Sequence, residues 1–295
     1  MGKYVITCCS TVDLTQYHMI RYGVEWVPFH YEIDGVEHDD DMWGTRNPVD
    51  FYEAMNRGAQ TKTSRVNVLE FQEFFERFLR LGLDVLHVSF SSGLSGTVES
   101  ARIAAQTLSV AYPERRITVI DSLCASSGYG LLVDKMSTLM NKGMDYDNLV
   151  KYAEANKLRV HHWFFSTDLS FYVRGGRISK TAAVVGSVLK ICPLLNMSNE
   201  GKLAPKEKIR TKKRALAATL QRMVDYAEDG LAYSGKAFIC HSVCDEDAEQ
   251  LARMVEGCFP NLDGKVEIFP IGPTIGSHTG PGTVALFFWG DPRAD

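Results

Sequence analysis

Residues 91–97, with the sequence SSGLSGT, gather serine and threonine hydroxyls around two glycines, between an apolar run and a helical pattern. The first amides of a helix lack backbone partners and carry partial positive charge, so they favour an anion. Glycine lets an anion approach the backbone, and hydroxyls add hydrogen-bond donors. The stretch therefore predicts a site for a carboxylate or a phosphate. It lacks the lysine of a Walker loop, and a simple capped turn would show the same pattern.

Two other stretches carry groups that could bind the same anion. TKTS, residues 61–64, reads as a polar turn before a helical pattern, which fits either a helix cap or a ligand contact. IGSHTGPG, residues 275–282, surrounds His278 with glycine and proline in what reads as a tight corner between two apolar strands. A histidine held in this way could donate a hydrogen bond to an anion or act as an acid or base, although a solvent-facing turn histidine fits equally well.

Basic residues form two further features. Arg174 and Arg177 flank a Gly-Gly turn, and the arginine side chain suits carboxylates and phosphates, although a plain surface turn looks the same. Residues 202–214 contain seven basic residues and one acid. Such a run fits an acidic or phosphate-bearing partner, or a solvated face.

Metal-binding patterns are missing from the sequence. His161 and His162 are adjacent in a predicted strand and point to opposite faces, as Cys8 and Cys9 do. The three aspartates at residues 39–41 lack the spacing of an EF-hand loop, and the seven scattered cysteines lack zinc spacing. We therefore expect no metal and no cofactor.

Alternation of strands and helices indicates the fold. Apolar strands at 3–8, 83–90 and 116–122 alternate with helices, one of them a strongly amphipathic segment that ends at Gly82. This order predicts a largely parallel sheet flanked by helices over residues 1–160. From about residue 160, closely spaced strand, turn and helix signals predict a second α/β domain over 161–295, with a mixed or antiparallel sheet. In open sheets, ligands bind where strand ends give way to loops.

Composition narrows the function classes. The chain has 295 residues, 45% of them hydrophobic, a formal net charge of -4 and a pI near 6.1, so it carries no electrostatic footprint for nucleic acid. No run of about 18 apolar residues is present, and the N-terminal stretch is too short for a signal peptide. Unpaired, scattered cysteines are typical of a reducing compartment. We expect a cytoplasmic monomer.

In this order and spacing, the motifs resemble the DegV family of fatty-acid-binding proteins, over nearly the whole chain. The motifs that carry the resemblance are ITCCSTVDL, VPFHYEIDGVEHDD, the TS at Thr63 and Ser64, SSGLSGTVESA, VIDSLCASSGYG, VRGGRIS, LKICPLLNMSNEGKLAPKEKIRT and IGSHTGPGTVALFF. The resemblance implies two α/β domains and a long-chain fatty acid whose tail lies in an apolar tunnel, between or beside the domains. It also implies a partner, the kinase subunit of a fatty-acid kinase, and it allows transient contact with a membrane surface.

The same resemblance assigns the carboxylate site. Thr63, Ser92 and His278 hold the carboxylate. The residues implied around them are Ser64, Ser91, Gly93, Arg177 and Thr279, and Arg174 and Arg210 are implied at the surface that faces the kinase. The protein would then bind and present the lipid, while the kinase supplies ATP, metal and phosphoryl transfer. A carboxylate is costly to desolvate without such hydrogen bonds.

Two departures from the family pattern stand out. Cys9 replaces the usual aspartate of the first motif, and Arg65-Val66 replaces the Gln-Pro that usually follows TS. A buried core cysteine is the simpler interpretation of Cys9. Two other functions stay open on the sequence. One is a phosphate- or acyl-phosphate-handling enzyme that uses Ser92 and His278, and the other is a regulatory protein that binds partners through residues 202–214.

Overall fold

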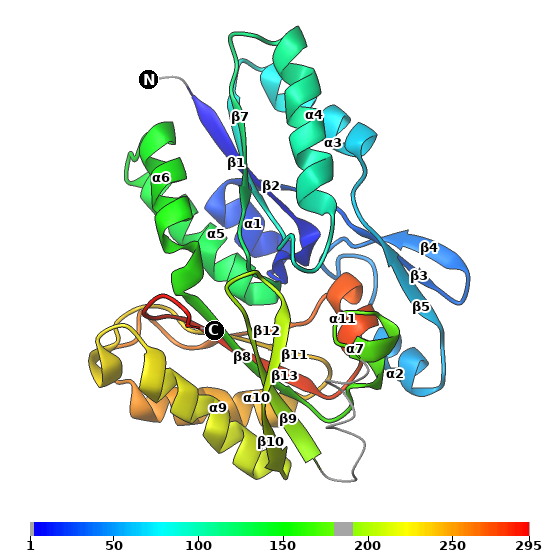
Figure 1. The fold of residues 1–295 in the computed structure, drawn as a ribbon, viewed down its shortest axis with the longest axis vertical. Helices are drawn as coiled ribbons and strands as arrows, with labels where there is room; N and C mark the ends of the chain where they lie inside the picture. Colours follow the sequence, from blue (N-terminus) through cyan, green and yellow to red (C-terminus); the bar gives the residue numbers. More distant parts are fainter. Residues whose placement is uncertain (1–2, 180–190, 295) are drawn as a thin grey trace.

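A computed structural model describes residues 3–179 and 191–294 (Figure 1). Three sheets organise the chain, with strand orders β2-β1-β6-β7, β10-β9-β8-β13-β11-β12 and β4-β3-β5. The strands are β1 (Tyr4–Cys9), β2 (Val24–Val27), β3 (His30–Ile33), β4 (Val36–Asp39), β5 (Thr61–Ser64), β6 (Asp84–Ser89), β7 (Ile117–Asp121), β8 (Val160–Ser166), β9 (Ile191–Met197), β10 (Leu203–Arg210), β11 (Phe238–His241), β12 (Glu267–Pro270) and β13 (Thr283–Trp289). The helices are α1 (Gln16–Tyr22), α2 (Pro48–Asn56), α3 (Val68–Leu79), α4 (Thr97–Ala111), α5 (Ser126–Asn141), α6 (Tyr146–Asn156), α7 (Ser170–Arg174), α9 (Lys212–Tyr226), α10 (Asp245–Cys258) and α11 (Pro273–Thr279).

The four-stranded sheet is parallel throughout and lies in the upper half of Figure 1, flanked by α3 and α4 on one side and by α5 and α6 on the other. Local signals explain its helices. Asn67 and Glu70 form a capping box at the start of α3, whose apolar face buries four phenylalanines against the sheet and α4: Phe71, Phe74, Phe75 and Phe78.

The six-stranded sheet is antiparallel except for the β11–β12 pair. Helices α9 and α10 pack against each other and against this sheet, while α5 contacts β8, β11 and β13. The predicted fold class, a parallel α/β part followed by a mixed α/β part, is therefore confirmed. The boundary near residue 160 falls where β8 begins, and it stays a prediction.

Helix α5 lies between the two halves of the molecule and packs against both, so it is buried on almost every side. Gly128 and Gly130 make this possible. A side chain at Gly128 would collide with His162 and Phe287 of the six-stranded sheet, and one at Gly130 would collide with Leu14. The helix therefore sits within close reach of both halves.

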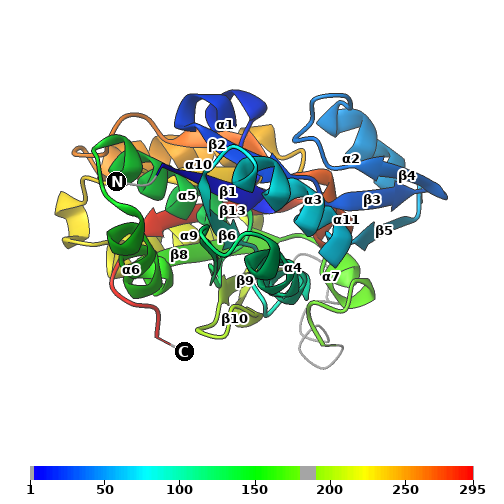
Figure 2. The same cartoon turned by 90° about the horizontal axis from the view of Figure 1, so that it is seen from above.

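The small β4-β3-β5 sheet projects to one side with α2 and α11 beside it (Figure 2). A hairpin with its turn at Asp34-Gly35 joins β3 to β4, with both turn residues at positive φ. Two predictions of local structure are wrong here. TKTS is not a turn but strand β5, which pairs with β3, and the expected corner around His278 contains helix α11.

Among the described residues, no helix has the length and apolar character needed to cross a membrane.

Candidate functional site

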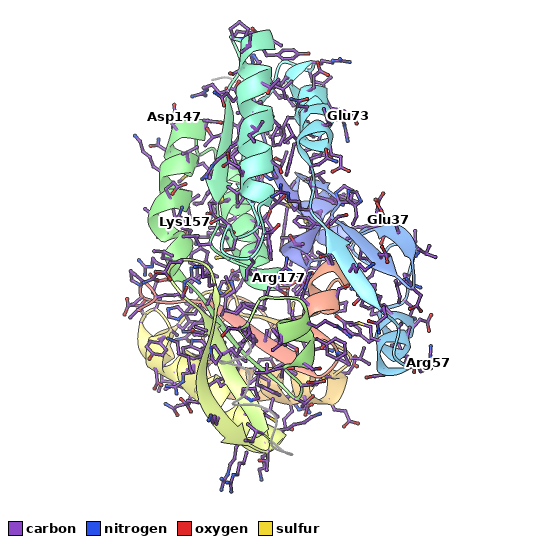
Figure 3. All side chains as sticks on the ribbon, turned by 45° about the vertical axis from the view of Figure 1, so that its right-hand side comes forward. Glu37, Arg57, Glu73, Asp147, Lys157 and Arg177 are labelled. Atoms are coloured by element: carbon purple, nitrogen blue, oxygen red, sulfur yellow. The ribbon has the colours of Figure 1, made fainter. Side chains whose placement is uncertain are left out.

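A cavity of about 360 Å³ lies between the two halves of the molecule. This volume falls within the range of roughly 300–1,000 Å³ typical of small-molecule sites. Arg177, which lines it, lies near the middle of the molecule in Figure 3. The described residues that line the cavity include no aspartate and no glutamate. None of these lining residues therefore carries a negative charge that would repel an anion or balance a cation.

Most of the cavity wall is apolar. Strand β13 contributes alternate residues, Thr283, Ala285 and Phe287, because side chains two apart share one face of a strand. Aromatic and aliphatic side chains from both halves complete the wall: Phe29, Phe90, Leu94, Phe164, Met197, Leu203, Ile271 and Ile275. Such a wall stabilises a hydrocarbon chain by removing it from water.

The polar end of the cavity is built around a threonine–histidine pair. Thr63 of β5 and His278 of α11 both line the cavity, and the Oγ1 of Thr63 lies 2.7 Å from the Nε2 of His278. The other ring nitrogen, Nδ1, has no hydrogen-bond partner among the described residues. Burial, followed by the positive charge of Arg177, lowers the pKa of His278 to about 4. The imidazole is therefore neutral at pH 7.

Glycines stand on either side of the histidine, one packed against its ring and one at the end of its helix. Gly175 lies directly against Nδ1 of His278, where an added methyl group would overlap the ring. Gly280 ends helix α11 at positive φ, immediately after the buried Thr279. The ring therefore has little freedom to turn away from Thr63.

Two buried carboxylates that the sequence analysis did not single out position α11. The Gly272 amide donates to Asp13 at 3.0 Å, and the Thr274 amide donates to Asp40 at 3.3 Å. Burial raises the pKa of both carboxyl groups, that of Asp40 to about 6. The sequence signal for Asp13 is its place in the motif ITCCSTVDL. In the structure, Asp13 has φ 45° and also accepts a hydrogen bond from the Ser126 hydroxyl.

The serines of the SSGLSGT segment, residues 91–97, lie in different environments. Ser91 is buried and donates to the Gly201 carbonyl at 2.8 Å, while Gly93 packs against the 200–201 turn. Ser92 is exposed and does not line the cavity, and its amide donates to Asp121 at 3.1 Å. The serine of this loop that lines the cavity is Ser95, which the sequence analysis did not select.

The other implied residues divide between the cavity and the surface. Arg177 and Thr279 line the cavity, and no described residue hydrogen-bonds the Thr279 hydroxyl. Ser64 is exposed on the opposite side of β5 from Thr63. Arg174, stacked over the Phe171 ring, and Arg210, at the end of β10, are also exposed. Their role as a partner surface stays a prediction.

The departures from the family pattern also have distinct places. Cys9 is fully buried, and burial raises the pKa of its thiol to about 12, which confirms a core cysteine. Val66 is buried in the core as well, whereas Arg65 lines the cavity. In the part of the chain that the structure describes, no group of three His, Cys, Asp or Glu side chains could hold a metal ion.

Known proteins resemble this chain over its whole length. A family model described as "Uncharacterised protein, DegV family" matches residues 3–291. A DegV domain-containing protein of Clostridium perfringens is 36% identical over 297 residues, which cover 99% of each chain. A DegV family protein of Thermus thermophilus, whose structure is described as fatty acid binding, has a TM-score of 0.87 and 27% identity, covering 98% of this chain and 99% of that one. A fatty acid binding DegV family protein of Streptococcus agalactiae has a TM-score of 0.82 and 25% identity, with each chain fully covered.

Proposed function

Because the chain belongs to the DegV family, we propose that it binds a long-chain fatty acid, with the carboxylate at Thr63 and His278 and the tail in the apolar cavity. The observation that carries the proposal is the Thr63–His278 pair at the polar end of a cavity with no acidic lining residue among those described. The fatty acid binding of the Thermus relative supports the ligand class.

The direction of the hydrogen bonds follows from the ligand. An ionised carboxylate only accepts hydrogen bonds, so the Thr63 hydroxyl must donate to it. Thr63 Oγ1 then accepts from Nε2–H of the neutral His278, which fixes that tautomer. The imidazole thus orients the threonine hydroxyl towards the headgroup. Ser95 and Thr279, both in the cavity wall, supply further hydroxyl donors.

The tail supplies most of the affinity. At about 0.8 kcal/mol per buried CH₂, a chain of about 16 carbons offers on the order of 10 kcal/mol before the costs of binding. The polar end then selects the headgroup. A carboxylate that is buried loses its hydrogen bonds to water, and the donors at this end replace them.

The bound acid is presented to a separate kinase, which phosphorylates the carboxylate to an acyl phosphate. Arg174 and Arg210, both exposed, form part of the surface that meets it. An Arg210→Glu variant should keep its affinity for the acid and lose phosphorylation by the kinase. Loss of both would place Arg210 in the lipid site instead.

The enzyme alternative is less well supported. A hydrolytic or transfer mechanism through His278 needs an acidic partner to orient and charge the ring. The partner observed for His278 is the Thr63 hydroxyl, and Ser92, the other group in that hypothesis, lies outside the cavity.

The test compares two ligands that differ only in the headgroup. Thr63→Val removes the hydroxyl and keeps the shape, so the affinity for palmitate should fall about 10- to 150-fold, the equivalent of a hydrogen bond to a charged group. The affinity for hexadecanol should change less. Ser64→Ala, on the opposite side of the same strand, is the control and should bind both ligands normally. Equal losses for acid and alcohol in Thr63→Val would count against a carboxylate site.

A further inference from the structure

We infer that Arg65 is a second headgroup ligand in this chain, pairing directly with the carboxylate of the acid bound at Thr63 and His278. The inference rests on the proposed function and concerns how that site selects its ligand. It makes Arg65 a specificity-determining residue that favours an ionised headgroup over a neutral one.

The backbone around Arg65 is firmly held. Arg65 follows strand β5 directly and stands two residues after Thr63, so both side chains reach the same cavity. The next residue, Val66, is fully buried, and Asn67 starts the capping box of α3. The backbone of Arg65 is therefore fixed, and the position of the guanidinium can change only through rotations within the side chain.

The guanidinium lies beside another positive element. Gly96, which also lines the cavity, lies against it, so that an added methyl group there would overlap the Arg65 side chain. Gly96 is the N-cap of α4, a helix of 15 residues, and no side chain caps the free amides there. A helix N-terminus carries partial positive charge, so an arginine placed against it is unfavourable unless an anion lies between them.

The acidic residue in the first turn of α4 is Glu99, which is exposed and does not line the cavity. Arg65 has no ion pair or hydrogen bond with any described residue, and Arg177, the other arginine in the cavity wall, donates only to the Gly175 carbonyl among them. Across the cavity, Thr279 is 8% exposed, and its hydroxyl has no partner within residues 3–179 and 191–294. These donors and positive charges converge on one end of the cavity, which an anionic headgroup would complete.

Guanidinium geometry explains why an arginine suits this position. Its planar fork can donate two parallel hydrogen bonds to a carboxylate, and it stays charged at every accessible pH. A lysine would retain the charge and lose the paired geometry. The Arg65 side chain is exposed, whereas Thr63 and His278 are half-buried, so it can meet the headgroup from the solvent side.

The experiment measures palmitate and hexadecanol binding to delipidated protein at low and high salt. Arg65→Gln should weaken palmitate binding about tenfold or more and leave hexadecanol within about twofold. It should also reduce the loss of palmitate affinity on adding salt. Arg65→Lys should restore part of the palmitate affinity. Arg102→Gln, which removes an exposed arginine from α4, is the matched control and should behave as the parent protein.

The outcomes separate this inference from the proposed function. Arg65→Gln binding palmitate as tightly as the parent, or losing both ligands equally, would overturn the role of Arg65 and leave fatty acid binding intact. Failure of the parent protein to bind either ligand would overturn the proposed function itself. An unchanged thermal midpoint in Arg65→Gln would confirm that any loss is not a folding defect.

Discussion

The cavity should limit the length of the acyl chain that the protein can bind, and a larger side chain at Ala285 should shorten the cavity. Ala285 lies in the centre of the six-stranded sheet, paired with Phe164 on one side and Cys240 on the other, and its methyl group faces the cavity. Ala285→Leu adds three carbon atoms there, which would occupy the space of about three methylene groups of the ligand. At about 0.8 kcal/mol each, a full-length acid should lose about 2.4 kcal/mol, or about 50-fold in affinity.

The assay is a series of saturated acids from 10 to about 18 carbons, titrated against the parent and the variant. The parent should gain affinity with each added carbon until the cavity is full, and Ala285→Leu should stop gaining about three carbons earlier. Ala111→Leu, at the exposed end of α4, is the control for the substitution itself. An equal loss at every chain length would refute the reasoning, because it would mean that the substitution damages the fold or the headgroup site rather than the tail site.

Three further predictions concern the histidine and the thiols. Gly175→Ala should push against Nδ1 of His278 and weaken palmitate binding about tenfold, whereas Gly257→Ala, with open space around it, should not; equal affinities in a titration would show that the ring position does not matter. The unfolded chain binds a proton at His278 near pH 6.5, and the folded protein only near pH 4, so acid destabilises the fold between those values. His278→Gln should therefore show a smaller fall in thermal midpoint from pH 7 to pH 4.5, and an unchanged fall would contradict the buried, neutral ring. In the native protein a thiol reagent should modify Cys258 and spare the six buried cysteines; rapid labelling of Cys9 in a mass-spectrometric digest would contradict its burial.

Local signals in the sequence were sufficient for much of the fold. The Thr15 cap of α1, the Asn47-Pro48 start of α2 and the Asp34-Gly35 hairpin are each determined by residues adjacent in the chain. The wrong predictions have non-local causes. TKTS forms a strand because β3, about 30 residues earlier, provides its partner.

Helix α11 was missed for a related reason. Its seven residues include Gly276, and Gly272 stands at its N-cap, so glycines obscure the helical pattern. Pro273 in the first turn was the one local signal that favoured a helix. What holds α11 in place is its contact with Asp13 and Asp40, more than 200 residues earlier, which periodicity does not reveal.

The sequence was sufficient to predict the kind of site and its threonine–histidine pair, but not which serine faces the cavity. The resemblance brought together Thr63 and His278, which are 215 residues apart in the chain and 2.7 Å apart in space. It did not distinguish Ser92 from Ser95, because which serine of a bent loop faces a cavity depends on the loop's tertiary contacts. In this case Ser91 is tied to Gly201 and Ser92 is turned to solvent.

The most direct measurement is the identity of whatever the protein carries after purification. Denaturing extraction of the intact protein, followed by mass spectrometry, should release a long-chain fatty acid in a ratio approaching one per chain, and the Thr63→Val protein should release less. Recovery of a phosphorylated small molecule, or of no organic acid together with failure to take up added palmitate, would contradict the account.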